Sequence, residues 1–235
     1  TTMNDPWLGV GVAVTDGNNV EAGLDIDGTN GVDAPVAATA ANTFNYAYNP
    51  PPGSPAPGDA PSTANSRSGA VVNLFYLTNR YHDQLYDLGF TEAARNFPAD
   101  NYGRGGVGGD RISAEAQDSS GTNNANFSTP ADGGRGRMQM YLWTGPTPDR
   151  DGDLDAEVVY HELTHGTSNR LHGNASGLST NMARGMGEAF ARELAGWAWD
   201  VVSDGPPEMS RRRHRAPSPR FRIRLASRPR RSPPT

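Results

Sequence analysis

The segment His161-Glu162-Leu163-Thr164-His165 constrains the fold of this chain more than any other part of its sequence. Residues four apart lie on one face of an α-helix, so a helix here would direct both imidazoles toward one point. Zinc sites that perform hydrolysis commonly combine two histidines at this spacing with one further protein ligand and water. The fold must therefore form a helix over this segment and bring a third ligand to it from elsewhere.

The third ligand is predicted to be Glu188, which lies 23 residues after His165 in the segment Gly185-Met186-Gly187-Glu188. We expect His161, His165 and Glu188 to bind one Zn²⁺ per chain. Glu162 directly follows His161 and is rotated off the ligand axis, so we expect it to act as the general base toward a zinc-activated water. The chain has no cysteine, which excludes thiolate ligands and disulfides.

Several segments along the chain resemble one known family in their order and spacing. They are Asn73–Tyr76, Tyr81–Asp83, Leu88–Glu92, Gly121–Phe127, Gly136–Tyr141, Tyr160–Leu171 and Gly185–Glu188. Over about residues 15–190 the chain resembles the fungalysin group (M36 type) of secreted zinc metallopeptidases, within the thermolysin-like gluzincin superfamily.

This resemblance implies an α+β fold of the thermolysin-like zincin type, with a strand- and loop-rich N-terminal lobe and active-site helices. We expect the C-terminal helical lobe of that fold to be truncated here. The resemblance also implies a secreted, extracellular endopeptidase that hydrolyses peptide bonds in protein or peptide substrates and is made with a pro-segment. Asn123, Asn124 and Ala125 resemble the segment that hydrogen-bonds substrate backbone along a sheet edge, although a polar turn would have the same composition.

Two departures from the family pattern concern catalysis. Arg192 occupies the position at which the resembled family has an aspartate that orients a ligating imidazole, and a cation cannot accept that hydrogen bond. No tyrosine follows Tyr160, and the only histidine after His172 is His214, so the residue that would stabilise the oxyanion is not evident. The alternative function is therefore a catalytically impaired zinc-binding fragment of such a peptidase.

The charge of the chain is unevenly distributed. Ten of its 21 arginines lie in residues 211–235, which contain no acid, although the net charge of the whole chain is -5. A basic tail of this kind could attach to polyanions, but the acidic remainder would repel phosphates, so we expect no specific nucleic-acid partner. No apolar run approaches the roughly 20 residues that span a bilayer, and we expect a soluble monomer without a membrane partner.

Periodicity predicts the principal elements and divides the chain into three parts. We expect a loop-rich extended segment over residues 1–66, a catalytic core over 67–209, and an Arg/Pro-rich tail over 210–235 that is disordered or aberrant. Helices are predicted over 68–88, over 155–170 and from Asn181, and strands over 7–14, 43–48, 111–116 and 137–143. In the last helix, the apolar residues that begin with Met186 and Phe190 form a stripe at helical spacing. Glu188, Ala191 and Ala195 lie on another side, so we expect Glu188 to project toward the preceding helix.

The segment from Asp149 to Asp155 has an acid at every second position around Gly152. This pattern is similar to a Ca²⁺ loop, but the distant bidentate glutamate of an EF-hand is missing. The other interpretation is capping, in which Asp153 or Asp155 accepts N–H bonds at the start of the following helix. Both interpretations remain open from the sequence alone.

Overall fold

The computed structural model describes residues 5–46, 58–204 and 223–224. Its elements in chain order are β1 (Val20–Leu24), β2 (Ala34–Pro35), β3 (Thr43–Phe44), α1 (Ala64–Asp87), η1 (Glu92–Ala94), β4 (Ile112–Ala116), β5 (Ala125–Ser128), β6 (Arg137–Met140), β7 (Leu142–Trp143), β8 (Arg150–Asp151), η2 (Gly152–Leu154), α2 (Ala156–Leu171), α3 (Asn181–Asp204) and β9 (Ile223–Arg224). This mixture of helices and strands confirms the expected α+β class.

The main sheet has five strands in the order β2-β1-β4-β6-β5. β1 pairs in parallel with β4, and β4 in parallel with β6, whereas β2 and β5 are antiparallel strands at the two edges. The segment before residue 66 therefore supplies two strands to the sheet of the core. The three-part division of the chain stays a prediction.

The tail assigned to residues 210–235 lies outside the described residues, except for Ile223 and Arg224. These two residues form β9, which pairs antiparallel with β3 and places Arg224 opposite Thr43.

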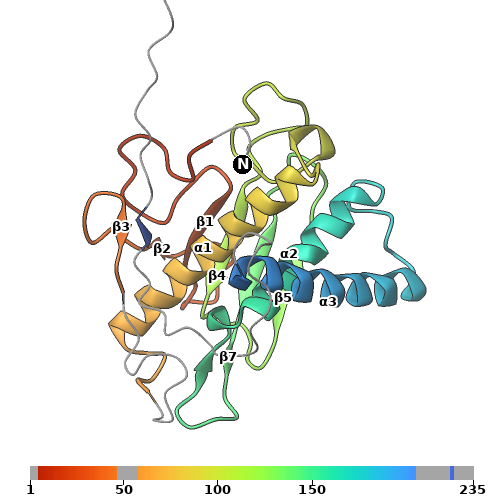
Figure 1. The fold of residues 1–235 in the computed structure, drawn as a ribbon. Helices are drawn as coiled ribbons and strands as arrows, with labels where there is room; N and C mark the ends of the chain where they lie inside the picture. The colour runs from red at the N-terminus through yellow and green to blue at the C-terminus, as the bar shows by residue number, and fades with distance from the viewer. Residues whose placement is uncertain (1–4, 47–57, 205–222, 225–235) are drawn as a thin grey trace, which may run out of the picture.

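Helix α1 lies across the sheet and packs on β1 and β4 (Figure 1). It begins after Thr63, whose side chain accepts a hydrogen bond from Ser66 N, and Gly89 follows its C-terminal end at a φ of 102°. Its inner face buries Val71, Leu74 and Phe75 almost completely. Within the described ranges, no helix is both long enough and apolar enough to cross a membrane.

Helix α2 begins where the capping interpretation placed it. The Asp155 carboxylate accepts hydrogen bonds from the backbone N–H groups of Glu157 and Val158. These groups have no partner within the helix, and a negative charge at this end also complements the helix dipole. The helix packs against α1 through Tyr81, whose hydroxyl lies 3.2 Å from Thr164 Oγ1 and 3.0 Å from Thr167 Oγ1.

Arg170, in the last turn of α2, is completely buried. Its guanidinium pairs with the Asp110 carboxylate at 2.8 Å and lies 4.2 Å from the centroid of the Phe97 ring. It also donates to the backbone oxygens of Pro130, at 2.7 Å, and of Gly134, at 2.6 Å. One side chain thus fixes the end of α2 to the loops that precede β4 and β6.

One strand prediction was wrong and another was confirmed only in part. Residues 7–14 form no strand, because Val12 N–H donates to Gly9 O in a turn that exposes Val10. The strand predicted over 137–143 is present but interrupted at Tyr141, so that β6 belongs to the main sheet while β7 pairs with β8. Pairing partners that are distant in the sequence thus decide where a strand ends.

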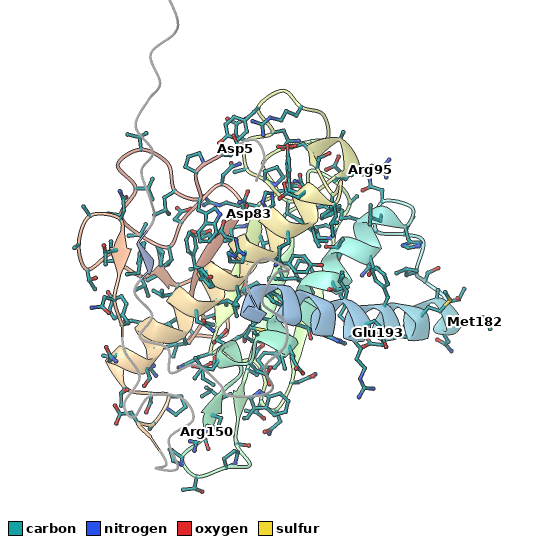
Figure 2. All side chains as sticks on the ribbon, viewed as in Figure 1. Asp5, Asp83, Arg95, Arg150, Met182 and Glu193 are labelled. Carbon is teal, nitrogen blue, oxygen red and sulfur yellow. The ribbon has the colours of Figure 1, made fainter. Side chains whose placement is uncertain are left out.

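The side of α3 that carries Glu188 packs toward α2, as its helical spacing predicted. Gly187, Ala191 and Ala195 are buried there, and these small residues allow the two helices to approach closely. Of the apolar stripe, Met186 and Phe190 are exposed, whereas Leu194 packs against the core. Met182 is exposed at the N-terminal end of this helix (Figure 2).

We predict that Arg170→Met lowers the free energy of unfolding by about 3 to 5 kcal/mol, because Asp110 would remain buried without its partner. Urea unfolding followed by circular dichroism measures this change. The double variant Arg170→Met/Asp110→Leu should recover part of the loss, since it leaves no buried charge. If Arg170→Met lowered the free energy of unfolding by less than about 1 kcal/mol, the stabilising role of the Arg170–Asp110 pair would be contradicted.

Candidate metal centre

Helices α2 and α3 bring the three predicted ligands together. The Nε2 atoms of His161 and His165 lie 2.9 Å apart, and their rings are nearly perpendicular. A Glu188 carboxylate oxygen lies 3.2 Å from Nε2 of His161 and 3.5 Å from Nε2 of His165. The structure thus gathers one oxygen and two nitrogens from residues separated by up to 27 positions in the sequence.

The spacing of these atoms fits a tetrahedral zinc ion. Bonds of 2.0 to 2.1 Å to a tetrahedral centre separate the donor atoms from one another by about 3.3 Å. The three observed separations lie on either side of that value. Two neutral imidazoles and one carboxylate are also a donor set that zinc prefers.

Glu162 lines the same pocket as the predicted ligands but does not belong to their cluster. Its side chain is buried, and this burial raises the pKa of the carboxyl group to about 7, with a further contribution from the negative charge of Glu188. A cation held at the ligand cluster would lower the pKa of Glu162 and favour its carboxylate form. Burial also lowers the pKa of His165, which favours the neutral imidazole that can bind a metal.

A pocket of about 470 Å³ contains the ligand cluster, and residues of α2, α3 and β5 line it. Asn124 and Ala125, two of the three residues predicted to bind substrate, line it. Asn123 does not, because its side chain donates to Thr144 Oγ1 and it faces a separate pocket of about 850 Å³.

Strand β5 is an edge strand. It pairs with β6 on one side, and no other strand of the described sheet joins it on the other. Such an edge presents N–H and C=O groups to which an extended peptide can bond as an additional strand.

Close packing between α2 and β5 fixes the distance from the ligands to this edge. A Cβ atom built on Gly166, the residue after His165, would lie only 2.7 Å from the Phe127 ring of β5. The Phe127 ring packs on Phe97, and Phe97 lies under the Arg170 guanidinium. The buried arginine is therefore connected through two aromatic rings to the wall of the pocket.

Sequence reasoning missed several residues that line the pocket: Asn126, Phe127, Asn169, Leu178, Arg184 and Gly187. Helical spacing could have identified two of them, since Asn169 lies four residues after His165 and Arg184 four residues before Glu188. Phe127 gave no such signal, because its role depends on strand pairing.

The residue expected to replace an orienting aspartate, Arg192, is exposed on α3. Among the residues that the structure describes, Glu188 is the only carboxylate within ion-pair distance of either ligand imidazole. The geometry is thus consistent with the departure noted in the sequence.

The acids of residues 149–155 have other partners. Asp155 caps α2, and Asp151 accepts hydrogen bonds from Asp153 N and from the Gln117 side chain. Within the described residues, the groups of three side chains that could share an ion are the ligand cluster and two sets around Asp25. A Ca²⁺ site at 149–155 therefore remains only a prediction.

A His-Glu-x-x-His helix joined by a glutamate from the next helix defines a metal site of the metallopeptidase class. Comparison with known proteins gives the family. The fungalysin metallopeptidase (M36) family matches residues 3–209, and the chain belongs to it.

Similar proteins include an extracellular metalloproteinase MEP of Fusarium vanettenii, 55% identical over 132 residues that cover 55% of this chain and 21% of that protein. An extracellular metalloproteinase 2 of Trichophyton rubrum is 58% identical over 124 residues, covering 52% of this chain and 20% of the relative. An extracellular metalloproteinase MEP of Pyricularia oryzae is 43% identical over 206 residues, covering 81% of this chain and 31% of that protein. The chain thus spans between about a fifth and a third of the length of these curated relatives.

We predict that Glu188→Gln weakens zinc binding by more than about 100-fold, because it removes a charged ligand and not merely an orienting group. Competition with a chromophoric chelator measures the affinity. Glu193→Gln is the matched control, since Glu193 is exposed on the same helix (Figure 2). Its position five residues later turns it about 140° around the helix from Glu188. Equal zinc affinity in the two variants would remove Glu188 from the ligand set.

Proposed function

We propose that this chain is the metal-binding part of a secreted, zinc-dependent endopeptidase. The observation that carries this proposal is the convergence of His161, His165 and Glu188 beside Glu162 in one pocket that is bordered by a free strand edge. Membership of a metallopeptidase family and the printed names of the relatives support it. Those names also support an extracellular location.

Each proposed site residue has a separate role in peptide hydrolysis. Zinc, when it is bound by His161, His165 and Glu188, supplies a Lewis acid that polarises the scissile carbonyl and makes water more acidic. Glu162 removes one proton from the attacking water as the C–O bond forms, and it then delivers that proton to the leaving amine as the C–N bond breaks. The edge of β5, including Ala125, holds the substrate backbone in an extended conformation.

We also propose that the fold is of the thermolysin-like zincin type. A helix pair that carries the ligands beside a mixed sheet with an edge strand is consistent with a thermolysin-like zincin. We also propose protein or peptide substrates, a monomeric state and a precursor with a pro-segment. The oxyanion-stabilising group is assigned to no residue of the described chain.

One observation favours a second candidate, a chain that binds zinc but turns over poorly. Arg192 is exposed, and no carboxylate besides Glu188 in the described part of the chain pairs with the ligand imidazoles. Loss of an orienting partner commonly reduces metal affinity or activity by about 10- to 100-fold.

We predict that Glu162→Gln lowers kcat by about 10²- to 10⁴-fold and leaves zinc bound, because glutamine cannot accept the proton. Hydrolysis of a quenched fluorescent peptide and metal analysis of the same sample measure the two quantities. Glu157→Gln, an exposed change on the same helix, is the control and should retain activity. Full activity in Glu162→Gln with zinc in place would show that the base lies elsewhere.

Zinc removal distinguishes the two candidate functions. A chelator should abolish peptide hydrolysis, and added Zn²⁺ should restore it in proportion to the metal bound. Stoichiometric zinc without measurable turnover would instead support the impaired form. Hydrolysis that persists after complete zinc removal would contradict both.

A further inference from the structure

Arg184 lies on α3 one turn before Glu188 and lines the pocket that contains the ligand cluster. Residues four apart share a helix face, so its side chain and that of Glu188 are directed to the same side. Arg184 is exposed, and no carboxylate in the described residues lies within ion-pair distance of its guanidinium. Its charge is therefore available to a molecule that enters the pocket.

The charges that line the pocket favour an anion near Arg184. A divalent cation at the ligand cluster would be balanced by the carboxylates of Glu188 and Glu162. The two imidazoles bind such a cation in their neutral form, and the remaining lining residues are uncharged: Asn124, Ala125, Asn126, Phe127, Asn169, Leu178 and Gly187. With the metal bound, Arg184 thus leaves one unbalanced positive charge.

The position of Arg184 limits which part of a substrate it can reach. Four residues of helix rise about 6 Å, whereas an extended peptide advances about 3.3 Å per residue. A peptide that pairs with β5 enters the pocket that residues of both β5 and α3 line. Arg184 is therefore within reach of a side chain about two residues or fewer from the scissile bond.

We propose that Arg184 determines specificity for peptides that carry an aspartate or glutamate side chain within two residues of the scissile bond. This inference rests on the proposed peptidase function and adds a substrate class to it. Because Arg184 is exposed, its ion pair with such a side chain should be worth about fivefold in kcat/KM. The preference should also weaken as salt screens the charges.

Capped octapeptides test this proposal, because acetylated and amidated ends leave the chosen side chain as the only carboxylate. The two peptides of each pair differ only in having Glu or Gln at one position. Four positions are tested, two before and two after the scissile bond, and kcat/KM is measured for every peptide. The wild type should prefer Glu about fivefold at one of these positions, less at 500 mM than at 50 mM NaCl. Arg184→Gln should abolish the preference.

Arg150→Gln is the matched control, because Arg150 is an exposed arginine on β8 that does not line this pocket (Figure 2). It should retain both the activity and the Glu preference. Equal cleavage of the Glu and Gln peptides by the wild type, or a preference that survives in Arg184→Gln, would overturn the role of Arg184 and leave the peptidase function intact.

Binding of the same peptides to zinc-loaded Glu162→Gln gives a readout that does not require turnover. Fluorescence anisotropy should show about fivefold tighter binding of the Glu peptide, and the added change Arg184→Gln should remove the difference. If the wild type cleaves no peptide at all, the proposed function fails, while this binding difference still decides whether Arg184 selects an anionic side chain.

Discussion

The buried ion pair between Arg170 and Asp110 is the interaction on which the arrangement of the pocket depends. A buried guanidinium is costly unless its N–H groups are bonded. Here the loop between β5 and β6 supplies two carbonyl oxygens in addition to the Asp110 carboxylate. Because Arg170 ends the helix that carries both histidines, the same contacts determine where that helix lies. The rings of Phe97 and Phe127, which pack against each other at a tilt of 59°, extend this constraint to β5.

A second constraint is the close approach of α3 to α2. Glu188 can reach both imidazoles only if the two helices lie near each other, and Gly187, Ala191 and Ala195 allow this because they are small. The cost is that Met186 and Phe190 face outward. The position of the third ligand therefore takes precedence over the burial of large apolar side chains.

Local sequence signals predicted much of this molecule. The i, i+4 histidines, the Asp155 cap and the Gly89 terminus each involve residues within a few positions of one another, and the structure contains the helices they indicated. The failures involve long-range packing. The exposure of Met186 and Phe190 depends on where α3 lies against α2, and the break at Tyr141 depends on β8 as a partner for β7, so neither follows from periodicity. Asn123 lies outside the pocket for the same reason, since its bond to Thr144 joins the segment before β5 to the residue after β7.

The free edge of β5 has a consequence for any polypeptide that pairs with it. The strand has four residues, so a partner must be extended over a similar length and must give up its own backbone hydrogen bonds there. A segment in a helix or an interior strand of a folded protein becomes extended and unpaired only after local unfolding. The free energy of this opening ranges from near zero in loops to the full unfolding free energy in the core. For folded partners, the local stability of a segment would then determine whether it binds to β5 more than its amino-acid sequence does.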